Sequence, residues 1–227
     1  MNKEQLLKIY FVFGAVYLLA VLFDLRLLTN IAKLSLVPLV FLSYYIFNKK
    51  CELIPIIIMG CCFLGDAFSL YPYNMIKISF VFFAISHLIF AYICFRSIKD
   101  LKVKKLIFSA VPVIILWFVY FNYSIKDIFG DQMGDLYSFV IVYSVVLSTF
   151  TILSLVNYFN NEIKVNLYPI IIALCFLVRD IIMAINSYIT DLIFFSATMV
   201  VAKVVGYYFL LRFVTTFDFK RLNGRLY

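Results

Sequence analysis

The sequence predicts an all-α, polytopic integral membrane protein, a bundle of eight transmembrane helices. Hydrophobic residues make up 65% of the 227 residues and charged residues only 14%, whereas a soluble domain is about half apolar and about a quarter charged. The apolar residues form long runs with short polar breaks, and each run approaches the length of about 20 residues that a spanning helix needs. The chain, residues 1–227, is therefore expected to be a single transmembrane domain.

Eight apolar runs have the length of a span. They cover residues 8–23, 28–47, 53–70, 75–95, 106–122, 136–157, 167–187 and 192–213. The breaks contain charges or turn residues, such as Asn-Lys-Lys at 48–50 and Tyr-Pro-Tyr-Asn at 71–74. The first run ends in Asp-Leu-Arg at 24–26 rather than at a small-residue cleavage site, which indicates a retained first helix.

The positions of the basic residues predict the orientation of the chain. Most of the 20 Lys and Arg residues fall at the two termini and in the breaks after the second, fourth and sixth spans. Because cytoplasmic loops carry an excess of Lys and Arg, both termini are expected in the cytoplasm, with the protein in an inner or plasma membrane. The same bias accounts for the net charge of +8, so no nucleic-acid partner is inferred. The five Cys lack metal-site spacing.

Two aspartates lie inside predicted spans. Asp66 ends the segment 63–66, Phe-Leu-Gly-Asp, and Asp180 ends the segment 176–180, Phe-Leu-Val-Arg-Asp. A charged side chain at the bilayer centre costs at least about 2.5–3.5 kcal/mol, so it usually has a partner or a function. The two spans run in the same direction and place the aspartates at a similar depth, so we expect them to face each other. Arg179 adjoins Asp180 and points to another helix face, toward headgroups or a neighbouring helix.

Other polar side chains also fall inside the predicted spans. His87, beside Ser86 in the fourth span, and Lys203 in the eighth are expected near mid-membrane, and Lys33 near the outer end of the second. With the aspartates, they are expected to converge on a cavity open toward the outer leaflet. The structural alternative is that the aspartates only pair with cations to fix the helix packing. His87 would then form a hydrogen bond between helices.

The buried pair of carboxyl groups predicts acid–base chemistry. Apolar surroundings favour the protonated form of a carboxyl group, and a second carboxylate nearby favours it further for one of the two. One protonated and one ionised carboxyl group make a general acid and a general base. That combination suits the addition of water to an acid-labile bond, and the bilayer suits a lipid substrate. Asp66, Asp180 and His87 are the candidate catalytic residues.

A weak internal repeat relates the two halves of the chain. The segments 63–66 and 176–180 align with one insertion. Each is followed by a turn and by a span with a buried ionisable group, His87 in one half and Lys203 in the other. The repeat predicts a parallel 4+4 arrangement about an axis along the membrane normal.

Two other functions fit the same residues. In a small proton-coupled transporter, the Asp, His and Lys side chains would form a proton or substrate relay. The spans, however, lack the Gly and Pro interruptions that mark transporter binding sites. In a non-catalytic lipid-binding membrane protein, the charges would be structural. A pocket open sideways to lipid favours the enzyme, whereas a path to both surfaces favours transport.

Four motifs follow one another along the chain. They are Ala-Lys-Leu-Ser-Leu-Val-Pro at 32–38, Gly-Asp at 65–66, Phe-Ala-Ile-Ser-His-Leu-Ile-Phe at 83–90 and Arg-Asp-Ile-Ile-Met-Ala-Ile-Asn at 179–186. In order, spacing and total length the chain resembles the YhhN family of eight-span membrane proteins, which includes the lysoplasmalogenases. The resemblance covers nearly the whole chain.

The resemblance implies hydrolysis of the vinyl ether bond of a lysoplasmalogen to a fatty aldehyde and a glycerophospho-headgroup. The partners would be membrane lipids and a lysophospholipid substrate, and no metal or organic cofactor is implied. One carboxyl group would protonate the β-carbon of the vinyl ether, and the other would orient water or stabilise the oxocarbenium ion. The residues that would bind or orient the substrate are Lys33, Lys203, Ser86 and Asn186.

Two residues depart from the family pattern. Arg179 stands where the family usually has a small polar residue, and Lys203 where it usually has Gln. Two added cations could hold both aspartates ionised, which would remove the general acid.

Overall fold

The computed structural model describes residues 3–48, 51–71, 73–98 and 101–219, and this part of the chain is helical apart from short connections. The helices are α1 (Lys3–Leu22), α2 (Arg26–Phe47), α3 (Leu53–Phe68), α4 (Tyr73–Ser97), α5 (Leu101–Met133), α6 (Leu136–Asn160), α7 (Lys164–Tyr188) and α8 (Ile193–Thr216). Each run predicted as a span falls on one of these helices. The all-α class is thus confirmed for the described residues.

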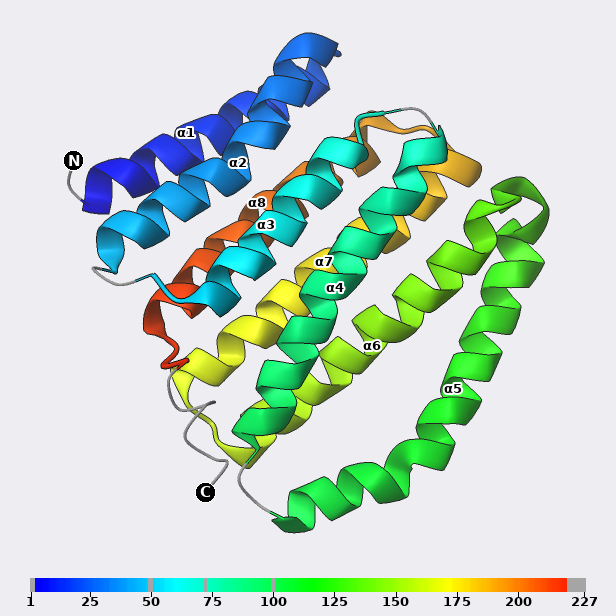
Figure 1. Ribbon diagram of the computed structural model, residues 1–227. Coiled ribbons are helices and arrows are strands. Elements are labelled where there is room, and N and C mark those ends of the chain that lie inside the picture. The colour runs from blue at the N-terminus through cyan, green and yellow to red at the C-terminus, as the bar shows by residue number, and fades with distance from the viewer. Residues whose placement is uncertain (1–2, 49–50, 72, 99–100, 220–227) are drawn as a thin grey trace.

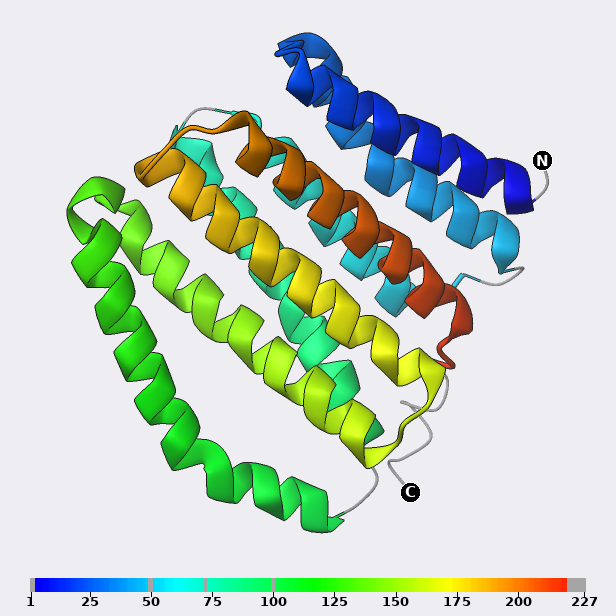
Figure 2. The same cartoon turned by 180° about the vertical axis from the view of Figure 1, so that it is seen from behind.

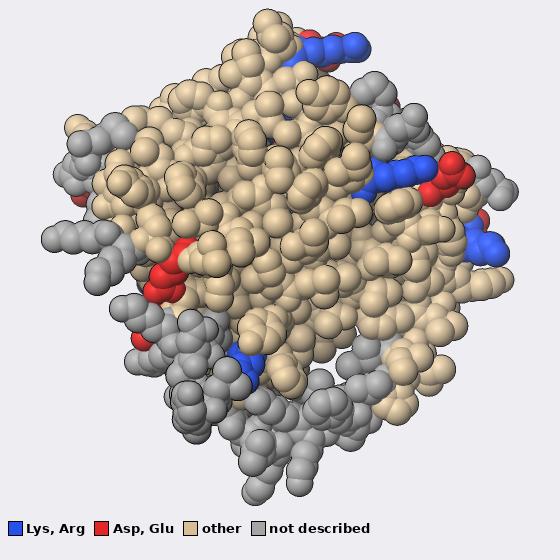
Figure 3. All heavy atoms as spheres, viewed as in Figure 1, with Lys and Arg blue, Asp and Glu red and all other residues tan. Residues whose placement is uncertain are grey.

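Six of the described helices are long and apolar enough to cross a membrane. They are α1, α2, α4, α6, α7 and α8. Helix α3 is apolar but has only 16 residues, about 24 Å at 1.5 Å per residue. Large hydrophobic side chains are widely exposed, including Leu27 at 77% and Phe194 at 70%. In Figure 3 the coloured charged side chains lie mainly near the edges of a broad uncharged face. These features indicate a multi-pass membrane protein.

The fifth helix differs most from the sequence prediction. Its predicted span ended at residue 122, but α5 continues to Met133. No Gly or Pro interrupts residues 123–129, and the helix stops just before Gly134, whose φ of 49° suits glycine. Helix α5 bends along its length (Figure 1), and it contains Pro112. A proline inside a helix removes a backbone hydrogen bond and kinks the helix, which accounts for the bend. The expectation that the spans lack Pro interruptions is therefore wrong for the fifth span.

The helices that contain the buried charged side chains lie in the middle of the bundle. Helix α7 packs most closely against α8, and α4 packs between α3 and α6. Helices α1 and α2 form a hairpin at one side, against α8 and α3, while α5 lies at the opposite edge and packs mainly on α6 (Figures 1 and 2). Pro38 and Pro169 lie inside α2 and α7 without breaking either helix.

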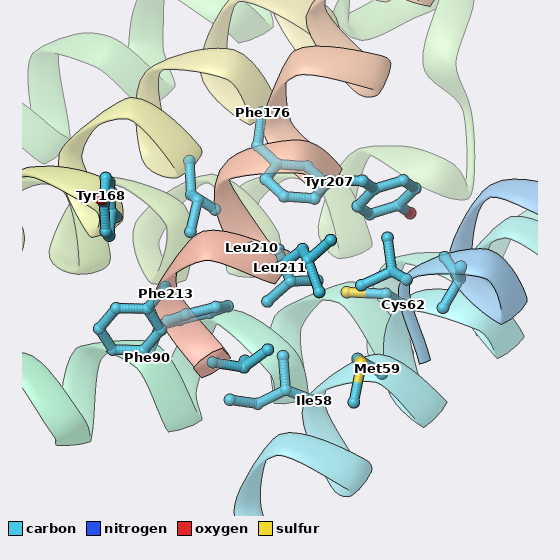
Figure 4. Packing of buried hydrophobic residues seen from close by; sticks show 14 of the residues in the cluster. Ile58, Met59, Cys62, Phe90, Tyr168, Phe176, Tyr207, Leu210, Leu211 and Phe213 are labelled. Carbon is cyan, nitrogen blue, oxygen red and sulfur yellow. The ribbon is translucent and has the colours of Figure 1, made fainter. Parts of the chain in front are cut away.

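Side chains on both sides of the central helices form the buried hydrophobic core. It combines residues of α3, such as Ile58 and Met59, with rings such as Phe176 of α7 and Phe213 of α8 (Figure 4). None of the described side chains of α5 belongs to this core. The core also includes residues of α1 and α2, so it fixes all the helices except α5 relative to one another and leaves α5 at the edge.

Candidate functional site

The carboxylate of Asp66 is buried and bound from α8. Its side chain is 1% exposed. Lys203 Nζ donates to Oδ1 at 2.5 Å, and the Tyr207 hydroxyl donates to Oδ2 at 2.7 Å. Lys203 and Tyr207 lie four residues apart, so they share one face of the helix. The ion pair compensates both charges in a setting where an unpaired charge is very unfavourable, and it joins α3 to α8.

The carboxylate of Asp180 has a second, separate set of partners. Arg179 Nε and Nη2 both lie 2.7 Å from its Oδ1. The hydroxyl of Tyr143, on α6, donates to Oδ2 at 2.5 Å. The Asp180 side chain is 13% exposed, so it is less enclosed than that of Asp66. This group of contacts joins α7 to α6.

Arg179 faces the interior of the bundle rather than the lipid headgroups. Its guanidinium lies between Phe83 of α4 and Phe176 of α7, with Cζ 4.6 Å from each ring centroid. A desolvated cation–π contact contributes about 2 kcal/mol or more. Of the two positions left open by the sequence, the structure shows the one against another helix.

The two aspartates are not joined directly. Within the described residues, the carboxylate of Asp66 bonds to Lys203 and Tyr207, that of Asp180 bonds to Arg179 and Tyr143, and no hydrogen bond or ion pair connects the two. The two carboxylates thus belong to two separate hydrogen-bonded clusters. Each consists of one carboxylate, one cation and one tyrosine hydroxyl.

A cavity lies beside one of these clusters. It has a volume of about 500 Å³ and lies between α4, α5, α6 and α7. Its walls are largely apolar, but they include the side chains of Asp180 and Tyr143. Asp66 and Lys203 are not among the lining residues. Asp180 and Tyr143 therefore form a carboxylate–hydroxyl pair in the wall of this cavity, and the Asp66 cluster does not line it.

A comparison with models of protein families identifies the family of the chain. A model of the YhhN family matches residues 25–216, which include both clusters and every helix from α2 to α8. The chain belongs to the YhhN family. No curated protein and no solved structure matches it. Among the described residues of this YhhN protein, no group of three or more His, Cys, Asp or Glu side chains could hold a metal ion.

His87 of this YhhN protein is buried without a hydrogen-bond partner. Its side chain is fully buried, and neither Nδ1 nor Nε2 has a partner. The imidazole packs against aromatic rings, stacked on Phe150 at 5.7 Å and edge-on to Phe176 at 4.8 Å between ring centroids. Ser86, next to it, contacts Cys62 Sγ at 3.3 Å. The structure thus places His87 beside Tyr143 of the Asp180 cluster, with 5.6 Å between ring centroids, but in hydrogen-bond contact with neither aspartate.

Replacing His87 by Phe is expected to raise the stability of the protein. The change removes two buried, unpaired ring nitrogens, each of which costs about 1–3 kcal/mol, and keeps a ring in contact with Phe150 and Phe176. The measurement is the midpoint of thermal unfolding in one detergent. If His87 also serves turnover, the variant is more stable and less active. A fall in stability would mean that the imidazole nitrogens are satisfied in the folded protein.

The remaining expected site residues divide into two groups. Lys33 lies close to the Asp66 cluster: its Nζ donates to Ser69 Oγ at 2.7 Å, and the Ser69 hydroxyl donates to the backbone carbonyl of Asp66 at 2.7 Å. Asn186 instead stabilises the α7–α8 connection, where its Oδ1 accepts from the backbone N–H of Leu192 at 3.0 Å. The structure therefore gives Asn186 a turn-forming contact.

Neither tyrosine is distinguished in the sequence as a candidate site residue. Tyr207 stands four residues after Lys203, and this helical spacing was the available signal. Tyr143 had no comparable signal, because its contact with Asp180 depends on how α6 packs against α7. With 17 Tyr in the chain, residue type alone cannot distinguish these two from packing residues.

The glycine before Asp66 allows α3 and α4 to approach closely. A Cβ at Gly65 would lie 2.9 Å from ring atoms of Phe83, the ring that contacts Arg179. Replacing Gly65 by Ala is therefore expected to destabilise the protein by about 1–3 kcal/mol. Gly60, on the same helix, is the matched control, because a Cβ there meets nothing within 4 Å. The Gly60→Ala change is expected to be neutral or stabilising by up to about 1 kcal/mol.

Thermal unfolding of the two glycine variants in the same detergent tests this difference. Equal midpoints for both variants would show that the Phe83 ring moves aside without loss, and the close approach of the two helices would then have no energetic role.

Proposed function

We propose that this YhhN protein is a membrane-embedded hydrolase of the lysoplasmalogenase type. It cleaves the vinyl ether bond of a lyso-ether-lipid and releases a fatty aldehyde and a glycerophospho-headgroup. The observation that carries the proposal is the Asp180 carboxylate, which shares a hydrogen bond with Tyr143 in the wall of an apolar cavity between apolar helices. Membership of a family that includes lysoplasmalogenases supports it.

The chemistry follows from the groups that face the cavity. A proton from the Tyr143–Asp180 pair adds to the β-carbon of the vinyl ether, the C=C π bond breaks, and an oxocarbenium ion forms. The Asp180 carboxylate stabilises this cation and orients a water molecule toward the α-carbon. Water adds, its proton restores the donor, and the resulting hemiacetal separates into the aldehyde and the free hydroxyl of the glycerol backbone.

Arg179 positions this pair. Its two N–H groups bind Oδ1 of Asp180, so Oδ2 is left for the Tyr143 hydroxyl and for water. Asp66 and Lys203 lie outside the cavity lining, and their proposed role is to hold α8 against α3 behind the reacting groups. The catalytic role of His87 and the orienting roles of Lys33 and Ser86 stay predictions.

The proposal includes an orientation in the membrane. All eight helices cross, with both termini in the cytoplasm, and α3 crosses with local thinning of a hydrocarbon layer that is about 30 Å thick. The cavity is lined by the start of α4 and α6 and by the end of α5 and α7. In this orientation those helix ends face the outside, so the cavity lies in the outer half of the membrane. The packing of α3 on α4 and of α7 on α8 is compatible with a parallel 4+4 repeat.

Turnover of a defined lipid by the purified protein tests the proposal. The substrate is a lysolipid with a vinyl ether, and the control is the same lysolipid with a saturated ether, which acid–base catalysis cannot cleave. Release of fatty aldehyde from the vinyl ether alone is expected. If neither lipid yields aldehyde, and cells with and without the protein contain the same amounts of lyso-ether-lipids, the proposed hydrolase activity is wrong.

A further inference from the structure

We infer that the cavity between α4, α5, α6 and α7 holds the single hydrocarbon chain of a lipid, and that the chain rather than the headgroup determines affinity. The inference rests on the proposed function in taking this lipid as the substrate. It goes further by assigning the binding site, the class of ligand and the basis of selectivity. The cavity accommodates one hydrocarbon chain and the ether linkage next to it.

The composition of the walls identifies the kind of ligand. Most lining residues are aliphatic or aromatic, such as Phe80, Phe121, Leu147 and Ile181, and only a few hydroxyl groups interrupt them. No Lys or Arg is among the described residues that line the cavity. A phosphate group would find no cation here and would lose its hydration, which is strongly unfavourable. The charged headgroup therefore remains outside, and only the chain and its linkage enter.

The dimensions fit one chain. The volume of about 500 Å³ lies within the range of about 300–1,000 Å³ that is typical of small-molecule pockets. Along α6 the lining extends from Leu136 to Ser148, which is about 18 Å at 1.5 Å per residue. This length is close to the half-thickness of about 15 Å of the hydrocarbon layer, the distance that one lipid chain fills.

The position of α5 provides a route into the cavity. Residues near the end of α5, including Phe121, Ile125 and Phe129, form one wall. This helix lies at the edge of the bundle in both views (Figures 1 and 2) and packs mainly on α6, and of its described hydrophobic side chains only Met133, at its end, is buried. A segment with few buried contacts opens at low free energy. A chain from the surrounding bilayer would thus enter sideways past α5.

The polar pair in the wall relates the chain to the reaction. Tyr143 and Asp180 lie in the part of the lining that belongs to α6 and α7. A lipid held in the cavity lies against these groups, while the apolar walls exclude competing water. Because no cation in the lining recognises the headgroup, choline, ethanolamine and glycerol headgroups are expected to bind with similar affinity.

Equilibrium binding of a lipid that cannot turn over tests the inference. The probe is a radiolabelled lysolipid with one saturated ether chain, added to the purified full-length protein in detergent. The test variant is Ala184→Trp, which places an indole in the cavity lining, and Ala184→Leu is a milder version. Leu174→Trp, also on α7, is the matched control, because Leu174 is exposed and does not line the cavity.

We expect Ala184→Trp to weaken binding at least about tenfold, because even two methylene groups kept out of the cavity give this loss. Ala184→Leu is expected to show a smaller loss and Leu174→Trp none, with matching thermal midpoints as evidence of folding. Wild-type affinity in both Ala184 variants, or a tenfold preference for one headgroup, would overturn the inference. Binding without any turnover of the vinyl ether would instead contradict only the proposed function.

Discussion

Replacing Lys203 by Met is expected to lower the free energy of unfolding by about 3–5 kcal/mol, the loss typical when one partner of a buried ion pair is removed. The change leaves the carboxylate of Asp66 with the Tyr207 hydroxyl but without its cation, at a position where it is 1% exposed. Chemical unfolding of the purified protein in detergent micelles measures the difference.

The double variant Asp66→Asn with Lys203→Met tests whether the loss comes from the unpaired charge. An uncharged amide beside a thioether has no unpaired charge, so much of the lost stability is expected to return, with a coupling energy of about 0.5–3 kcal/mol. The pair of Lys77, whose side chain is 25% exposed, and Asp135, whose side chain is 87% exposed, provides the less buried control, at 3.5 Å. Lys77→Met is expected to cost no more than about 1 kcal/mol. Equal losses for the two lysines would contradict a buried, structural ion pair.

Replacing Asp180 by Asn is expected to reduce turnover of the vinyl ether lipid by about 10²–10⁴-fold, the contribution typical of a positioned acid or base. The amide keeps the shape of the side chain but no longer stabilises the cation that forms beside it. The rate of aldehyde release at saturating substrate is the quantity to measure. Tyr143→Phe, which removes the hydrogen bond to Oδ2 of Asp180, is expected to lower the rate as well.

Two controls separate a catalytic from a structural effect of Asp180. Asp24→Asn changes an exposed carboxylate, 86% exposed and 3.9 Å from Arg26, and should leave turnover unaltered. Binding of the saturated ether lysolipid should also persist in Asp180→Asn, because the apolar walls are intact. If turnover survives in Asp180→Asn and disappears in Asp66→Asn, the assignment of the reacting carboxylate to the α6–α7 cluster is wrong.

The family and the helical architecture could be anticipated because they depend on local patterns. Apolar runs of spanning length predicted the ends of most helices to within a few residues. Helix α5 is the exception, because only tertiary context and the turn at Gly134 determine where it stops. Four short motifs, in their order along the chain, indicated the family. Asp66 and Asp180 stood out because a charge in an apolar run is costly in any fold.

The partners of these charges could not be read from the sequence. A helical period shows that Lys203 and Tyr207 share a face, but it does not show that this face meets Asp66. Arg179 could have pointed to headgroups, and only the packing of Phe83 and Phe176 around it shows that it does not. Depth alone led to the expectation that the two carboxylates face each other, but depth does not determine rotation about the helix axis, so it does not identify the partners of either one.

The sequence by itself determined that this is a helical YhhN protein with two costly carboxylates inside its apolar helices, because composition, period and the energy of a buried charge are local properties. The tertiary structure decided which cation and which tyrosine each carboxylate meets, and that Asp180 with Tyr143, rather than Asp66, reaches the cavity. The physical reason is that helix rotation and packing are set by side chains far apart in the chain. The Gly65–Phe83 approach is one such contact, and the Tyr143–Asp180 hydrogen bond is another.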